Sequence, residues 1–140
     1  MRFLLALAAA PLVLAGCETA FVGRAPNGRY ALVEVNGRPL PYLADPASAC
    51  PATIQSGHFD LDSLARRFEM MLDRSGPCPA ANADAVERGS YLRRSGRLEL
   101  EAARPGGDTR TLVATESGRT IALGYDGLRL RFRQVAPPPR

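Results

Sequence analysis

Apolar and polar residues alternate in short segments along most of the chain between residues 28 and 135. In residues 97–102 and 128–133, an apolar residue occupies every second position and charged residues stand between them. A period of two places apolar side chains on one face of a β-strand and charged ones on the other. The same pattern predicts eight strands, at residues 28–35, 52–61, 65–73, 85–94, 97–102, 109–115, 119–123 and 128–133.

Turn signals separate these segments at near-regular intervals. Short strands joined by tight turns predict an all-β fold, a single antiparallel eight-stranded meander that closes into a small barrel. The turn signals, which are typical of hairpins, are Asn36-Gly37, Ser75-Gly76, Ser95-Gly96, Gly106-Gly107-Asp108, Ser117-Gly118 and Asp126-Gly127. The residues expected to point inward and to fill the core are Phe59, Leu61, Phe68, Met70, Leu98, Leu100, Leu128, Leu130 and Phe132.

One segment also fits a helix. Within residues 61–73, Leu61, Leu64 and Phe68 fall at helical spacing, and Asp62 or Ser63 is available as an N-cap. We favour strands, because a hairpin of residues 52–61 with 65–73 brings its two open ends together. A cysteine lies just beyond each of these ends.

Those two cysteines, Cys50 and Cys78, are predicted to form a structural disulfide. Bridged Cα atoms approach to about 4.4–6.8 Å, which paired hairpin ends provide, and disulfides persist in the secretory compartment predicted below. Metal binding by the two thiols with His58 is the alternative. It falls short of the four ligands that structural zinc sites use.

The first residues have the layout of a secretory signal. Met1 and Arg2 give a positive start, and an apolar run follows over residues 3–14. At about a dozen residues this run is too short to span a bilayer as a helix, which needs about 20.

The run ends in Leu14-Ala15-Gly16-Cys17, which resembles the bacterial lipoprotein signal. The resemblance implies cleavage after Gly16, a diacylglyceryl group on Cys17 and acylation of the new amino terminus. Glu18 follows the cysteine, where aspartate is the signal for retention at the inner membrane. We therefore expect lipid anchoring at the outer membrane on its periplasmic face, with the inner membrane and the cell surface as alternatives. An ordinary signal peptide with a chance cysteine remains the competing interpretation.

The predicted organisation is a signal peptide at residues 1–16, a lipidated tether at 17–27, a barrel domain at 28–135 and a proline-rich tail at 136–140. All 18 basic residues are arginine, and the formal net charge is +4. This mild excess predicts no nucleic-acid partner. Rows such as Arg129, Arg131 and Arg133 would attract anionic lipid or polysaccharide. The plainer interpretation is cross-strand pairing with carboxylates such as Glu87, Glu99 and Glu101.

Catalytic motifs are missing from the sequence. It has one histidine and no phosphate loop, Gly-x-Ser-x-Gly elbow or paired metal ligands, so we expect no enzyme activity and no cofactor. His58, Asp60 and Asp62 would share one strand face, but Phe59 and Leu61 alternate with them as the inward residues. The three polar side chains are therefore expected to face solvent, with a weak cation site as the alternative.

A further resemblance concerns the barrel. Residues 28–41, residues 56–61 and the later hairpins around 125–127 and Phe132 look like small bacterial lipoproteins with lipocalin-like barrels. The first of these segments is also similar to the opening of META-domain lipoproteins, but the Gly-Cys-Asn motif of that family is missing. The resemblance implies a barrel shape.

Two functional hypotheses follow. In the first, a small apolar ligand binds in the barrel or at its mouth, with Phe59, Phe68, Met70 and Phe132 as candidate contacts. In the second, the barrel is solid and acts as a protein-interaction or inhibitor module of the cell envelope. The proline-bearing loop at residues 38–49 would then be a contact surface.

Overall fold

Ten β-strands follow one another in residues 28–135, the part of the chain that the computed structural model describes, and they belong to one sheet. The predicted signal peptide, the predicted lipid attachment at Cys17, and the predicted tether and tail all lie outside these residues. The strands are β1 (Gly28–Val35), β2 (Arg38–Pro39), β3 (Tyr42–Ala44), β4 (Ala52–Asp62), β5 (Arg67–Ser75), β6 (Ala85–Arg94), β7 (Arg97–Ala103), β8 (Thr109–Ser117), β9 (Thr120–Tyr125) and β10 (Leu128–Gln134). A short 3₁₀ helix, η1, spans Pro79–Ala81.

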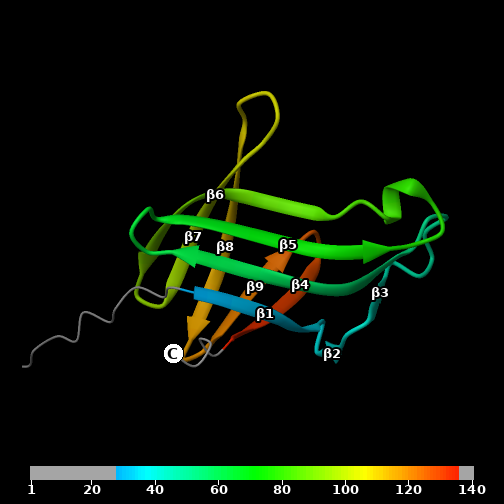
Figure 1. Cartoon of the computed structure of the whole chain (residues 1–140), viewed down its shortest axis with the longest axis horizontal. Coiled ribbons are helices and arrows are strands. Elements are labelled where there is room, and N and C mark those ends of the chain that lie inside the picture. The colour runs from blue at the N-terminus through cyan, green and yellow to red at the C-terminus, as the bar shows by residue number, and fades with distance from the viewer. Residues whose placement is uncertain (1–27, 136–140) are drawn as a thin grey trace, which may run out of the picture.

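Eight of these strands close into an antiparallel barrel. Neighbours in sequence pair from β4 to β10, and β1 pairs with both β10 and β4, which joins the two edges of the sheet. In Figure 1, β1, β4 and β5 run side by side, and β7, β8 and β9 cross them at a steep angle. The prediction of an all-β, eight-stranded barrel is confirmed.

Residues 61–73, where a helix was the alternative, belong to the β4–β5 hairpin. The register pairs Leu61 with Phe68 and Asp62 with Arg67, and residues 63–66 form the turn. The Asp62 carboxylate accepts hydrogen bonds from the backbone N–H groups of Leu64 and Ala65 at 2.9 and 3.0 Å. An aspartate that bonds to nearby backbone in this way favours a turn over a continuing strand or helix.

Three other hairpins have tight turns of the type that the sequence predicts. Both central residues have positive φ in Asn36-Gly37, Ser95-Gly96 and Asp126-Gly127. Such turns match the right-handed twist of the strands they join. They explain why these segments fold into consecutive antiparallel pairs.

Strands β2 and β3 were not predicted; residues 38–49 were expected to form a loop across one barrel end. Each is short and pairs with one strand, β2 with the end of β1 and β3 with the start of β4. The direct β1–β4 pairing covers Gly28 to Ala31 opposite His58 to Leu61. Beyond it the two strands separate, and β2 and β3 extend their free edges. Pro39 is tolerated there because proline disrupts central strands and not edges.

Inward-facing apolar side chains form one continuous core. Of the nine residues predicted to point inward, Leu128 is half-buried against the core and the other eight are at most 4 % exposed. The Phe59 ring lies 5.8 Å from that of Phe68 and 5.6 Å from that of Phe132, measured between centroids. These separations are in the favourable range for aromatic pairs. The interior of the barrel is therefore packed at its centre.

Because neighbouring strands run in opposite directions, turns collect at two ends of the barrel. We call residues 28–30, 62–67, 93–97, 116–120 and 133–135 the termini end, since β1 begins there and β10 finishes there. The disulfide end consists of residues 36–52, 76–84, 103–109 and 126–129. In Figure 1 the β4–β5 turn, the start of β1 and the finish of β10 lie to the left and lower left.

Candidate functional site

The four residues predicted to contact a ligand lie in the centre of the core. Phe59, Met70 and Phe132 are 0 % exposed, and Phe68 is 4 % exposed. Phe59 contacts the rings of both other phenylalanines. Their surfaces are thus used in packing against one another, and a ligand role for them stays a prediction.

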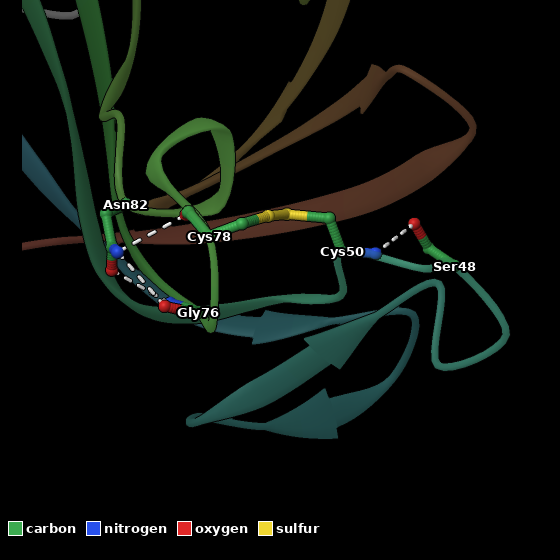
Figure 2. The surroundings of a disulfide bond; sticks show 5 residues. All are labelled: Ser48, Cys50, Gly76, Cys78 and Asn82. Carbon is green, nitrogen blue, oxygen red and sulfur yellow. Dashed lines mark hydrogen bonds between the residues drawn. A yellow bond between two sulfur atoms is a disulfide. The ribbon is translucent and has the colours of Figure 1, made fainter.

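The disulfide between Cys50 and Cys78 is confirmed, with the two Cα atoms 6.0 Å apart. Figure 2 shows it bridging the segment before β4 to the segment after β5. Nearby, Asn82 accepts a hydrogen bond from the Gly76 N–H at 2.9 Å and donates to the Gly76 carbonyl at 3.0 Å. The Ser48 hydroxyl accepts a hydrogen bond from the Cys50 N–H at 3.1 Å. Covalent and polar contacts therefore fix the connections on both sides of the hairpin.

Gly76 shows how tightly this corner is packed. A Cβ atom at this position would lie 2.3 Å from the Ala81 Cβ and 2.6 Å from the Pro51 carbonyl oxygen. Only glycine fits without displacing η1 or the start of β4.

Residues 38–49 are held to the barrel by one face and expose the other. Leu40 and Tyr42 are partly buried against the core, and the Asn36 side-chain amide donates to the Tyr42 hydroxyl at 2.9 Å. Leu43, between these anchors and the disulfide, is 47 % exposed. The loop thus presents an apolar side chain on a braced support.

A buried carboxylate, Glu87, lies in the barrel interior near the disulfide end and is 7 % exposed. It accepts a hydrogen bond from the Tyr125 hydroxyl at 3.1 Å and one from Arg110 at 3.3 Å. Arg110 also donates to Asp126 at 2.6 Å and lies 4.8 Å from the centre of the Tyr125 ring. Burial, and then the Glu87 charge, raise the pKa of Tyr125 to about 12.

The sequence alone did not bring these residues together as a network, although Glu87 was predicted to be a possible partner of arginines. Glu87 stands at an inward position of β6, four residues before buried Tyr91. This inward position was the feature of the sequence from which a buried polar network could have been predicted. A carboxylate at an inward strand position needs charged or hydrogen-bonding partners across the barrel.

A row of charges crosses the outer face of β1, β4, β5 and β6. Register places Arg29 opposite Asp60, Asp60 opposite Glu69, and Glu69 opposite Arg88. Arg29 donates to both Asp60 oxygens at 2.9 and 2.8 Å, and Arg88 donates to Glu69 at 2.6 Å. The His58 Nε2 atom lies 3.8 Å from a carboxylate oxygen of each acid.

This row is a ladder of ion pairs on the wet side of the sheet. His58 and Asp60 are partly exposed. Asp62 is not part of the row, because its carboxylate accepts a hydrogen bond within the β4–β5 turn. Within residues 28–135, no three His, Cys, Asp or Glu side chains gather closely enough to hold a metal ion. The cation-site alternative for the three residues thus finds no support in the geometry.

A surface groove of about 880 Å³ runs beside this ladder. We call it the β5–β6 groove. Buried Leu61 and Phe68 line it together with the more exposed Arg67, Glu69 and Arg88. Phe68 is thus the one residue of the four ligand candidates that borders this groove.

No protein-family model, curated protein or solved structure matches the chain. The resemblances to lipoprotein signals and to barrel lipoproteins therefore stay predictions. In residues 28–135 there is no helix with the length and apolar character needed to cross a membrane.

Proposed function

We propose that this protein is a lipid-anchored barrel of the cell envelope that acts without catalysis, through its outer surface, as a protein-interaction module. The filled interior is the observation that carries this proposal. An eight-stranded barrel has room either for packed side chains or for one small ligand. Here twenty buried side chains from all eight barrel strands form one cluster, which favours the solid alternative.

The braced loop at residues 38–49 is the contact surface that we assign to a partner. Binding costs free energy for every side chain and loop that must become ordered, and a pre-ordered loop reduces this cost. The disulfide, the Ser48 hydrogen bond and the Tyr42 hydroxyl contact supply that order. Leu43 supplies exposed apolar surface at its centre.

Photo-crosslinking in cells tests this assignment. A photoreactive amino acid in place of Leu43 should give one discrete adduct with an envelope protein. Leu92, on the outer face of β6, is the matched control because it is 48 % exposed against 47 % for Leu43. The adduct should disappear in the double variant Cys50→Ser/Cys78→Ser. No adduct at Leu43, or equal adducts at both positions, would contradict the proposal.

The β5–β6 groove supports a second candidate function, binding of a small apolar ligand over Leu61 and Phe68. Native mass spectrometry of protein purified from membranes separates the two candidates. A retained small molecule that is lost in Ala103→Trp, which fills the groove, would favour this second function. Thr109→Trp is the control, because Thr109 is the exposed cross-strand partner of Ala103. A species without a bound molecule would favour the solid interaction barrel.

The anchor is tested in the same samples under denaturing, non-reducing conditions. The expected mass is that of residues 17–140 plus acyl chains, two hydrogens below that of the reduced form. A chain that begins elsewhere, without lipid, would contradict the anchored part of the proposal and leave the contact loop to be judged by crosslinking.

A further inference from the structure

Positive charge is concentrated at the termini end of the barrel. This end contains two carboxylates, Asp62 and Glu116, and eight arginines: Arg29, Arg66, Arg67, Arg93, Arg94, Arg97, Arg119 and Arg133. The disulfide end is balanced, with three arginines, Arg38, Arg104 and Arg129, and four aspartates, Asp45, Asp84, Asp108 and Asp126. The net charge of the whole chain is therefore small, but the charge is distributed unevenly between the two ends of the barrel.

Most arginines of the termini end form no ion pair with a carboxylate of the described residues. Arg29 pairs with Asp60, and Arg93 with Glu116. Within residues 28–135, ion pairs are lacking for the other six, Arg66, Arg67, Arg94, Arg97, Arg119 and Arg133, all of which are exposed. By contrast, Arg88, Arg110 and Arg131, on the strands between the two ends, each contact a carboxylate.

One pair of these arginines is unfavourable for the fold itself. Arg94 and Arg97 stand directly opposite each other where β6 turns into β7. Like charges in directly opposed positions destabilise an antiparallel pair. The fold alone gives no reason for this pair, whereas an anionic surface at this end does.

An apolar side chain projects from the same end. Leu64, in the β4–β5 turn, is 95 % exposed, and Arg66 and Arg67 follow it. The Asp62 carboxylate fixes the turn by accepting hydrogen bonds from the N–H groups of Leu64 and Ala65. Apolar side chains flanked by arginines suit the membrane interface, where the apolar part enters the acyl boundary and the cations remain among headgroups.

We infer that the termini end docks onto a bilayer that contains anionic phospholipid, with the unpaired arginines against headgroups and Leu64 in the interfacial layer. The inference rests on the proposed lipid anchor. Gly28 follows Cys17 by eleven positions, a span of at most about 40 Å, and it enters the barrel at this end. The anchor thus holds the basic end nearest to the membrane, and each arginine at an anionic surface strengthens association about fivefold. The braced loop at the disulfide end then faces away, toward soluble partners.

Tryptophan fluorescence provides the test, because the chain contains no tryptophan. Acylated Leu64→Trp protein is reconstituted in phosphatidylcholine vesicles with or without phosphatidylglycerol, and with brominated acyl chains as quenchers. We expect blue-shifted, quenched emission in the anionic vesicles that weakens at high salt. Leu43→Trp at the disulfide end is the control and should remain unquenched. Equal quenching at both positions, or none at Leu64 in anionic vesicles, overturns the inference.

A charge variant identifies the arginines as the cause. Replacing Arg66, Arg67, Arg94 and Arg97 by glutamine should lower Leu64→Trp quenching in anionic vesicles to its level in neutral ones. The control replaces Arg104 and Arg129 at the disulfide end and should leave quenching unchanged. Quenching that persists after the four arginines of the termini end are replaced overturns the inference. Binding to an envelope polysaccharide that depends on Arg66, without quenching in vesicles, also overturns it.

Failure of the anchor and failure of docking give different results. An acylated chain without quenching at Leu64 keeps the anchor and refutes docking. A chain that carries no lipid but shows Leu64→Trp quenching when mixed with anionic vesicles refutes the anchor and keeps docking.

Discussion

At the disulfide end of the barrel the charges are balanced and the cysteines are bonded, whereas the termini end has an excess of positive charge that its own two carboxylates do not neutralise. Cys50 is bonded to Cys78, and Asn82 forms hydrogen bonds with Gly76. On the strands next to this end, Glu87 contacts both Tyr125 and Arg110. At the opposite end, six arginines make no ion pair within residues 28–135, and the buried Tyr91 hydroxyl has no hydrogen-bond partner.

This difference distinguishes the groups that maintain the fold from the groups that are available for function. Cross-links and satisfied buried polar groups stabilise the folded state. Unneutralised charges and an exposed leucine contribute little to it, which leaves them available for contacts outside the domain. Substitutions at or next to the disulfide end should therefore destabilise the barrel, whereas substitutions at the termini end should not.

The largest effect is expected from removing the disulfide. The bonded cysteines are 28 residues apart in sequence, and closing a loop of that length stabilises a domain by roughly 3–4 kcal/mol on the chain-entropy model. We expect Cys50→Ser/Cys78→Ser to lower the free energy of unfolding by that amount in urea denaturation followed by circular dichroism. A loss below about 1 kcal/mol would mean that β3, η1 and the Asn82 hydrogen bonds maintain this end without the bridge.

The next effect concerns the buried carboxylate. Glu87→Gln removes the charge that contacts Arg110 and accepts the Tyr125 hydrogen bond. Hydrogen bonds to charged groups contribute about 2 kcal/mol, so we expect a destabilisation of this size by the same measurement. Glu101→Gln, on the exposed face of β7 and without an ion pair in residues 28–135, is the control and should change stability by less than about 0.5 kcal/mol. Equal effects of the two substitutions would show that the network contributes little.

Much of the fold was predictable because its signals are local. Period-two alternation marked all eight barrel strands, and dipeptides such as Asn36-Gly37 and Asp126-Gly127 marked their turns. The disulfide followed from two cysteines at the open ends of one hairpin. Strands β2 and β3 escaped because Arg38–Pro39 is too short to show alternation and pairs with an edge that exists only where β1 and β4 separate.

The features that bear on function were less accessible because they depend on barrel closure. Glu87 is 23 residues from Arg110 and 38 from Tyr125, and only the register of the strands brings the three together. The arginines of the termini end come from five separate segments of sequence. Rows such as Arg129, Arg131 and Arg133 were predicted to pair with carboxylates. In residues 28–135, Arg131 pairs with Glu34, while Arg133 forms no ion pair.

Two tyrosines allow the ends to be compared with the same substitution. Tyr125→Phe removes a hydrogen bond to Glu87, so we expect a loss of about 1 kcal/mol at neutral pH. Tyr91→Phe removes a buried hydroxyl that has no hydrogen-bond partner among the described residues, so it should be neutral or slightly stabilising. Thermal unfolding of both variants checks this. A clear loss in Tyr91→Phe would show that its hydroxyl is satisfied, and the contrast between the ends would weaken.

Alkaline pH tests the same contrast through titration. The pKa of Tyr125 is about 12 in the folded protein against 10.0 for the free side chain, so between these values the unfolded state loses its proton first. The stabilisation that Tyr125 contributes through its raised pKa is complete below pH 10 and is lost as the pH rises toward 12. At pH 11 the loss is about 1 kcal/mol. Tyr125→Phe should therefore show a shallower decline in unfolding free energy over this range. Some decline should remain, because burial also raises the pKa of Tyr30 and of Tyr91.

The smallest effect is the one that decides whether the termini end is under strain from its own charge. Arg94→Gln relieves the opposition of Arg94 and Arg97, so we expect the free energy of unfolding to rise by a few tenths of a kcal/mol. Arg131→Gln breaks the exposed pair with Glu34 and should lower it by a similar amount. Both differences should vanish in about 1 M salt, where the Debye length is near 3 Å. The free energy of unfolding is measured by urea denaturation. If at low salt it rises in Arg94→Gln and falls in Arg131→Gln, Arg94 is retained at the expense of stability. A loss of stability in Arg94→Gln would instead mean that the arginine serves the fold, and the case for an anionic surface would rest on Leu64 and the remaining arginines.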